Sequence, residues 1–449
     1  MFDALFIDSD VANLFTDKAI VQAMLRFEAA LALAQADANV ISFDHARLIA
    51  RVCESAEIDL EKIIRAAKLA GNPAIPLVKE LTILVRKTDA AAAGLVHDGA
   101  TSQDLIDTAT MLQLKAALSN LYLGVTRLQQ RLTELINEHR ETVMIGRTLL
   151  QQARPISFAF KLACWLDQLI RCRDRLREVR ARALVLQFGG AVGTLAASGH
   201  DALTIMSRLA ERLELGEPTM PWHTARDRLF EVASALAMLS GCLGKIATDA
   251  SLMMQTEVDE ISEAAEEGRG GSSAMPHKRN PVAPTMIVAA CSRVPGLLAT
   301  MSASLMQEHE RSVGRWHAEW SPLPEIVCLT GGAIKHAGEL FSHLDVNVTR
   351  MRENIDVTRG LVFAESIAIA IGKEIGKSEA EELVKLACQR AREKDCHLHK
   401  ILSQDPTLSR VLDQATLEQI FRPENALGIA NQLIERVLMQ GTGNEPASE

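Results

Sequence analysis

Apolar side chains recur every three or four positions along three long stretches of the chain, and this spacing predicts long α-helices. The apolar positions run from Met111 to Leu135, from Leu162 to Ala183 and from Leu229 to Met253. Steps of three and four alternate without a break, as in helices that pack along a common seam. Because about 30 helical residues span roughly 45 Å, these helices are long enough to form one bundle.

Two further helices are expected after the third stretch. One begins near Pro284 and runs to about His309, and the other runs from about Pro324 to Arg352. The Gly331-Gly332 pair lies inside the second of these, where it makes a kink plausible.

Shorter helical patterns flank the bundle and are broken at sites such as Gly71-Asn72-Pro73 and Asp405-Pro406. The predicted fold is therefore all-α: an elongated bundle of long helices with a smaller helical domain at each end. The expected domains are an N-terminal helical domain at residues 1–110, a central long-helix bundle at 111–355 and a C-terminal helical domain at 356–449.

Apolar residues lie beside the first stripe as well as on it, for example Leu112, Ala116 and Leu123. A bundle with this surplus of apolar surface usually buries it against other subunits, so we expect a homo-oligomer whose core is the central bundle.

Composition narrows the class of protein. The 449 residues are 48% hydrophobic and 4% aromatic, which fits a globular helical protein better than an all-β one. A net charge of −9 makes nucleic acid an unexpected partner. The eight cysteines form no C-x-x-C pair, so neither a zinc site nor a disulfide framework is expected. We find neither a signal peptide nor an apolar run of about 18 residues, and we expect a cytoplasmic protein without membrane contact.

The segment 258–281 has no apolar periodicity and carries three glycines at 268, 270 and 271. Ser272 and Ser273 follow, and then the run Met-Pro-His-Lys-Arg-Asn-Pro at 275–281. Glycines beside a cluster of hydrogen-bond donors fit a loop that closes over an anionic substrate and expels water. A solvated hinge is the alternative, and composition alone does not separate the two.

The run GSSAMPHKRNP at 271–281 resembles the signature loop of the fumarase/aspartase superfamily, which includes argininosuccinate and adenylosuccinate lyases. HDGATSQD at 97–104 and GRTLLQ at 146–151 resemble two other conserved segments, in the superfamily's order. The resemblance implies a homotetramer with a central helical core. It also implies that each active site combines the three segments from three different subunits.

The chemistry that this resemblance implies is anti addition or elimination across a carbon–carbon bond next to a carboxylate. Ser272 would be the carbon acid/base, with Ser273 as its rival, and Lys278 and Asn280 would stabilise oxyanions on the serine and the substrate. The candidate substrate-binding residues are cations and neutral donors that suit a polyanion: His97, Thr101, Ser102, Arg147, Thr148, Gln151, His277 and Arg315. A surface ion pair for each arginine and a structural role for His97 stay open. No cofactor or metal is expected.

Leu149 departs from the superfamily pattern. Lyases that expel an amine or hydroxyl usually carry Thr-His-x-Gln, whereas this chain has Thr148-Leu149-Leu150-Gln151. An amine must be protonated to leave, and loss of the acid that protonates it costs about 10²–10⁴ in rate. A carboxylate, with a pKa of about 4, needs no such proton. Leu149 therefore indicates that the nucleophile or leaving group is a carboxylate.

GRTLLQ and the run ERSVGRWHAEW at 310–320 resemble one branch of the superfamily, the bacterial 3-carboxy-cis,cis-muconate cycloisomerases of protocatechuate catabolism. The implied substrate is a small tricarboxylate, one carboxylate of which adds to a double bond and closes a γ-lactone while Ser272 delivers a proton to carbon. An intermolecular lyase similar to adenylosuccinate lyase is the alternative, with another histidine such as His97 in place of the missing one. A catalytically silent helical tetramer is the third hypothesis.

Overall fold

The computed structural model describes residues 2–264, 270–271, 275 and 277–442. The described chain is built from helices, with two small two-stranded antiparallel sheets. The predicted all-α class is confirmed. The chain divides into two compact units, unit 1 (residues 1–126, 172–244 and 286–336) and unit 2 (residues 127–171, 245–285 and 337–449). The expected division into three consecutive domains stays a prediction.

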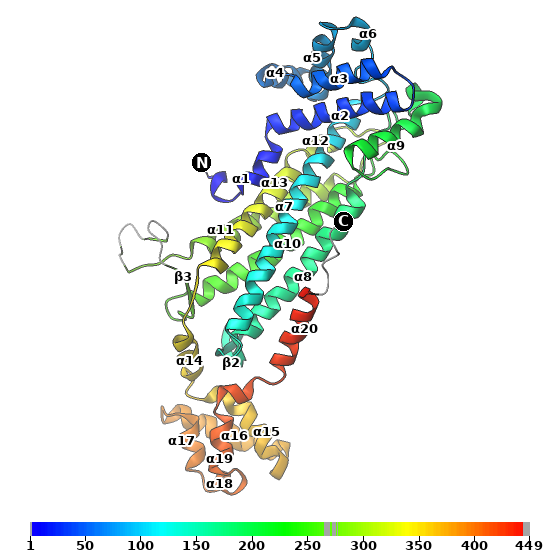
Figure 1. Ribbon diagram of the computed structural model, residues 1–449. Coiled ribbons are helices and arrows are strands. Elements are labelled where there is room, and N and C mark those ends of the chain that lie inside the picture. The colour runs from blue at the N-terminus through cyan, green and yellow to red at the C-terminus, as the bar shows by residue number, and fades with distance from the viewer. Residues whose placement is uncertain (1, 265–269, 272–274, 276, 443–449) are drawn as a thin grey trace. The chain divides into compact units, whose positions relative to one another are not determined.

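Five long helices form the centre of the fold (Figure 1): α7 (Ser102–Glu138), α8 (Phe158–Ala183), α10 (Asp227–Met253), α11 (Val282–Ala303) and α13 (Pro322–Ser342). Every apolar position of the three predicted stripes is buried. Within unit 1, α7 packs closely against α13, because a Cβ on Gly124 would lie 2.7 Å from the Ile334 side chain.

Two predicted helix boundaries are wrong. The helix expected to reach His309 ends at Ala303, and the one expected to reach Arg352 ends at Ser342. The chain then forms β4 (Leu344–Val346), which pairs with β3 (Ile261–Glu263), and α14 (Val348–Asp356), which the Asn347 side chain caps. Asn347 satisfies the first free N–H groups of the new helix and so favours a break before it.

The Gly331-Gly332 pair lies within a continuous helix, α13. A Cβ atom on Gly332 would lie only 2.0 Å from the carbonyl oxygen of Phe6. These glycines therefore give the N-terminal segment room to contact α13.

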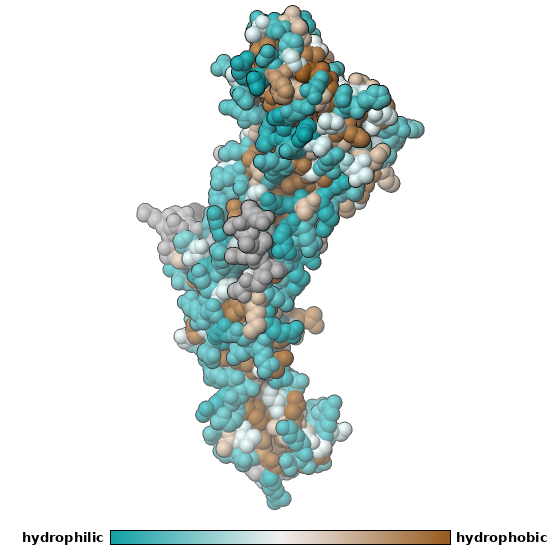
Figure 2. Space-filling view, turned by 45° about the vertical axis from the view of Figure 1, so that its right-hand side comes forward, coloured by the Kyte–Doolittle hydropathy of each residue, from teal (hydrophilic) through white to brown (hydrophobic). Residues whose placement is uncertain are grey.

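Apart from α2 (Asp17–Asp37), the remaining helices of unit 1 are short. Most of them belong to its N-terminal part: α1 (Ser9–Ala12), α3 (Phe43–Ser55), α4 (Leu60–Ala70), α5 (Ala74–Arg86), α6 (Ala90–Ala93), α9 (Ala202–Leu213) and α12 (Arg315–Ala318). Their surface is mixed: brown apolar side chains interrupt the teal polar ones at the top of Figure 2.

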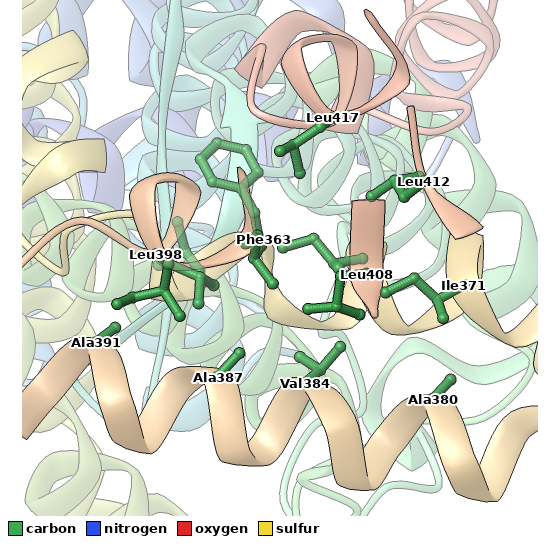
Figure 3. Close-up of a cluster of buried hydrophobic side chains, with 14 of the residues drawn as sticks. Phe363, Ile371, Ala380, Val384, Ala387, Ala391, Leu398, Leu408, Leu412 and Leu417 are labelled. Atoms are coloured by element: carbon green, nitrogen blue, oxygen red, sulfur yellow. The ribbon is translucent and has the colours of Figure 1, made fainter. Parts of the chain in front are cut away.

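The C-terminal part of unit 2 contains a cluster of helices: α15 (Ala364–Ile375), α16 (Lys377–Glu393), α17 (Leu398–Ser403), α18 (Leu408–Val411) and α19 (Gln414–Ile420). The last helix, α20 (Ala430–Thr442), follows this cluster and is not part of it (Figure 1). Figure 3 shows one face of α16 turned to the buried apolar cluster, with Ala380, Val384, Ala387 and Ala391 in a row. Their spacing of three and four residues keeps them on one side of the helix.

Unit 2 also contains a β-hairpin, β1 (Val143–Thr148) and β2 (Gln151–Ser157). Val143 and Ile145 are buried in the C-terminal apolar cluster of unit 2. The base of the hairpin is therefore anchored in that cluster. The segment GRTLLQ, residues 146–151, thus covers the end of β1, the turn at Leu149-Leu150 and the first residue of β2.

Within the described part of the chain, three helices are long and apolar enough to cross a membrane, judged by length and composition alone: α2, α10 and α11. Within the chain, 61% of the most apolar stretch of α2 and 56% of that of α10 are buried, but only 28% of that of α11. Several apolar side chains of α11, such as Met286, Val288 and Leu297, are therefore only half-buried in a single chain.

Candidate active site

The tip of the β1–β2 hairpin carries two leucines in the left-handed region of backbone space. Leu149 has φ 50° and Leu150 has φ 63°. Their side chains are 96% and 75% exposed. Left-handed backbone costs about 1–2 kcal/mol for a residue with a Cβ atom. Such strain beside an exposed apolar pair, between the predicted substrate-binding residues Thr148 and Gln151, marks the tip as a candidate functional element.

Arg147 forms a bidentate ion pair with Glu260, whose side chain is 0% exposed. The two nitrogen–oxygen distances are 2.9 and 2.7 Å. The Asn354 amide donates to the same carboxylate at 3.0 Å. The guanidinium charge is thus already balanced within unit 2.

The predicted catalytic residue Ser272 and its rival Ser273 lie outside the described residues, so the structure places neither of them. Near the C-terminal end of the signature segment, His277 and Lys278 are exposed and Asn280 is half-buried. The Asn280 N–H donates to the carbonyl oxygen of Gly270 at 2.9 Å.

Glu263 fixes the base of the signature segment. Its carboxylate accepts a hydrogen bond from the N–H of Ala283, in the first turn of α11, at 2.9 Å. A carboxylate at the first turn of a helix is stabilised by the free N–H groups there. This contact joins β3, which precedes the segment, to the helix that follows it.

In unit 1, His97 has φ 62° and its Nδ1 lies 2.5 Å from Oε1 of Glu28, a carboxylate that is 1% exposed. Burial lowers the pKa of His97, but the charge and hydrogen bond of Glu28, with a contribution from Asp104, more than offset this, so the pKa is raised above its usual value. A cationic His97 suits an anionic substrate.

Asp104 positions the start of α7. It is fully buried and accepts hydrogen bonds from the backbone N–H of Thr101 at 3.0 Å and of Gly190 at 2.8 Å. Nε2 of His223 lies 2.7 Å from the same carboxylate. The buried carboxylate of Asp104 therefore fixes Thr101 and Ser102 at the start of α7.

Arg311 is a cation that sequence reasoning did not include among the candidates. It donates to Oγ1 of Thr101 at 2.9 Å and to the carbonyl oxygen of Ala191 at 3.0 Å. The predicted residue Arg315 instead pairs with Glu308 at 2.5 Å, and its side chain is 42% exposed. Arg311 lies within the same run, ERSVGRWHAEW, so a test of every arginine in that motif would have found it.

A buried charge cluster lies at the start of α7, near Asp107. Arg226 forms ion pairs with Asp107 at 2.7 Å and with Glu319 at 2.7 Å, and all three side chains are at most 4% exposed. The indole N–H of Trp316 donates to Asp107 at 3.0 Å. Burial raises the pKa of Glu319 in spite of Arg226. This cluster fixes α12 against the start of α7 within unit 1.

The two units hold different parts of the predicted site. Unit 1 contains His97, Thr101, Ser102 and Arg315, whereas unit 2 contains Arg147, Thr148, Gln151, His277, Lys278 and Asn280. Their catalytic and binding roles stay predictions. Among the described residues there is no group of three or more His, Cys, Asp or Glu side chains that could hold a metal ion.

Comparison with known proteins defines the class. The lyase family model matches residues 8–296, and a second model, the adenylosuccinate lyase C-terminus, matches residues 360–437. The chain belongs to the lyase family of the fumarase/aspartase superfamily, as its signature segments predict.

Within this family, the chain is similar to proteins named 3-carboxy-cis,cis-muconate cycloisomerase. The 3-carboxy-cis,cis-muconate cycloisomerase of Pseudomonas aeruginosa is 46% identical over 99% of this chain and 98% of that protein. The protein of the same name from Bradyrhizobium diazoefficiens is 47% identical over 94% of each chain. The crystal structure of the 3-carboxy-cis,cis-muconate lactonizing enzyme from Pseudomonas putida matches with a TM-score of 0.94 and 42% identity, covering 98% of both chains.

Proposed function

We propose that the protein is an isomerase of the intramolecular lyase type that converts 3-carboxy-cis,cis-muconate into a γ-lactone. Relatives of this name are 42–47% identical over 93–99% of the chain. The observation that carries the proposal is the side chain at position 149. Leu149 occupies the exposed tip of the hairpin, between Thr148 and Gln151, and offers no proton to a leaving group. A carboxylate that adds to a double bond within the same molecule needs no such proton.

The reaction forms a carbon–oxygen bond and a carbon–hydrogen bond and breaks one π bond. A substrate carboxylate attacks one alkene carbon, and the π electrons move towards the neighbouring carboxylate, which becomes a doubly charged aci-carboxylate. Ser272 then delivers a proton to the carbon that lies between the attacked alkene carbon and this aci-carboxylate. Lys278 stabilises the oxyanions of this intermediate with its positive charge, and Asn280 stabilises them with hydrogen bonds.

The substrate has three carboxylates and therefore needs cations and hydrogen-bond donors. In unit 1, His97 with its raised pKa and Thr101 meet this need. In unit 2, Thr148, Gln151 and Lys278 do so. Positioning and charge account for the reaction without a cofactor.

We further propose that the protein is a homotetramer in which each site combines segments of different subunits. In its most apolar stretch only 28% of α11 is buried, and apolar side chains such as Met286, Val288 and Leu297 are half-buried, which supports association with further copies. The exposed leucines at the hairpin tip support the same arrangement. The eight free cysteines fit a reducing compartment, which supports a cytoplasmic location.

The test is an assay of the purified protein with 3-carboxy-cis,cis-muconate, in which loss of the diene's ultraviolet absorbance is followed. Adenylosuccinate serves as the parallel substrate. We expect rapid loss with the first substrate alone. Turnover of adenylosuccinate alone would overturn the argument from Leu149 and would require another histidine to act as the acid. Sedimentation of the same preparation tests the tetramer, and a stable monomer at micromolar concentration would contradict it.

A further inference from the structure

We infer that Arg147, Glu260 and Asn354 form a clamp that positions the hairpin and the signature segment together, and that Arg147 contributes to the reaction through this clamp and not by binding a substrate carboxylate. The inference rests on the proposed function. It assigns a positioning role to Glu260 and Asn354, two residues that no motif of the chain singles out.

The clamp joins three segments that are distant in sequence. Arg147 lies on β1, Glu260 immediately precedes β3, and Asn354 lies on α14. Besides its contact with Glu260, the Asn354 amide donates to the carbonyl oxygen of Val258 at 2.7 Å. The Asn354 carbonyl oxygen accepts a hydrogen bond from the Gln152 side chain at 2.9 Å. Asn354 therefore contacts two segments. Its carbonyl oxygen binds the hairpin through Gln152, and its side-chain amide binds the 258–260 segment.

Further hydrogen bonds connect the clamp to residues that flank the signature segment at 271–281. The carbonyl oxygen of Glu260 accepts from the N–H of Asn347, and β3, which begins at Ile261, pairs with β4. Glu263, at the end of β3, accepts from the N–H of Ala283. Hydrogen bonds, together with the backbone of residues 260–263, thus connect the strand that carries Thr148 to the helix that follows Lys278 and Asn280.

The charge of buried Glu260 explains why Arg147 has a positioning role. Glu260 is fully buried, and a buried carboxylate without a partner is strongly destabilising. Arg147 uses two of its N–H groups and its charge to balance Glu260, so the pair is neutral. A neutral pair attracts a substrate carboxylate far less than a free guanidinium would. The predicted role of Arg147 as a substrate-binding residue is replaced in this inference by a positioning role.

The decisive experiment compares Arg147→Gln with the double variant Arg147→Gln/Glu260→Gln. The single change leaves Glu260 buried without its cation, so the hairpin shifts; since a displacement of about 1 Å can cost about 10²-fold in rate, we expect kcat to fall by about 10- to 100-fold. KM should change by less than about threefold. In the double variant no buried charge remains and the two amides can pair, so kcat should recover at least about fivefold over the single variant.

A substrate-binding role predicts the opposite pattern. The double variant would then be as slow as the single one, because the guanidinium is missing from both, and KM would rise about tenfold or more in each. That result would overturn the inference. Arg154→Gln is the matched control, because Arg154 lies on the same hairpin and pairs with Glu365 at an exposed site, 42% and 63% exposed. Its activity should stay within about twofold of the wild type.

Hydrogen–deuterium exchange of the same variants gives a readout that needs no turnover. Arg147→Gln should speed exchange in residues 143–157 and in 257–263 together, and the double variant should slow it again in both. Faster exchange in neither segment would overturn the clamp. If the wild-type protein does not convert 3-carboxy-cis,cis-muconate, the proposed function fails, but this exchange pattern still decides the inference. Circular dichroism and sedimentation establish that each variant is folded and assembled.

Discussion

His97 combines a left-handed backbone with a short contact to a buried carboxylate, Glu28. Because this contact favours the protonated imidazole, the pKa is raised in the folded protein. The stability that the pair contributes is complete below the ordinary histidine pKa of about 6.5 and is lost as the pH rises through the higher folded-state value. The charge available to an anionic ligand disappears over the same interval.

We predict that the affinity for propane-1,2,3-tricarboxylate, a substrate-like trianion, falls as the pH rises above about 6.5. In Glu28→Gln the fall should begin at a lower pH, because burial then lowers the pKa of His97 with less opposition. Calorimetric titration at several pH values measures both. An affinity in the Glu28→Gln variant with the same pH dependence as in the wild type would contradict the prediction.

The leucine pair at the hairpin tip gives a second prediction at this scale. A two-residue hairpin turn with positive φ at both positions favours Asn-Gly. Leu149→Asn/Leu150→Gly should therefore raise the free energy of unfolding by about 1–3 kcal/mol, measured by urea denaturation. Turnover of 3-carboxy-cis,cis-muconate should fall at least about tenfold, because the polar tip no longer excludes water. Leu69→Asn, at a site 93% exposed on α4, is the control that should change neither.

The candidate site could be predicted from sequence only where its residues lie in continuous motifs. Asp104, although it lies in the HDGATSQD motif, and Arg226 were not among the candidates. Their partners are distant: Asp104 contacts His223, 119 residues away, and Arg226 contacts Glu319, 93 residues away. A lone aspartate or arginine looks like a surface residue until its partner is known. Even Arg147, which the motif identified, proved to be paired with a glutamate that the motif does not contain.

At the scale of elements, the apolar stripes correctly predicted α7, α8 and α10 but not where α7 begins. The helix begins at Ser102, nine residues before Met111, and its first turns bury the polar residues Gln103, Asp104 and Asp107. A hydrophobic pattern cannot reveal burial that is satisfied by hydrogen bonds. The strands β3 and β4 were missed because they pair across 80 intervening residues and each has only three residues.

The anchoring of the hairpin in the C-terminal cluster leads to a prediction for Ile145→Ala. Ile145 is fully buried there, so the change should lower the free energy of unfolding by about 2–5 kcal/mol. Because the strand that carries Arg147 and Thr148 loses its support, kcat should fall as well. Denaturation and steady-state kinetics measure the two effects. Ile369→Ala, at a site 55% exposed on α15, should cost less than about 0.5 kcal/mol and leave kcat unchanged; an equal loss in both variants would refute the anchoring role.

At the scale of the whole molecule, the predicted site residues are divided between unit 1 and unit 2. In the proposed tetramer, each site takes its unit 1 residues from one subunit and its unit 2 residues from another. A variant with a damaged residue in one unit can therefore still supply the intact residues of its other unit to a shared site. We predict that mixing Thr101→Ala with Lys278→Ala, after mild dissociation and reassembly, restores activity that neither variant has alone. The mixture is assayed with 3-carboxy-cis,cis-muconate.

The control for this mixing experiment is Lys278→Ala with Asn280→Ala. Both changes lie in the same segment, so a hybrid site always receives one damaged copy of it. No activity should return. Recovery in the control, or its absence in the first mixture, would contradict a site built from several subunits.

Trp316, whose indole donates to Asp107, is one of four tryptophans that are distributed unevenly over the two units. Of the four tryptophans, Trp222, Trp316 and Trp320 belong to unit 1 and Trp165 belongs to unit 2. The rings of Trp316 and Trp320 are edge to face with centroids 5.0 Å apart, a geometry that favours exciton coupling in the near-ultraviolet. Replacing Trp165 by Phe leaves fluorescence from unit 1 alone. Tryptophan fluorescence of that variant thus reports on unit 1 without an attached dye.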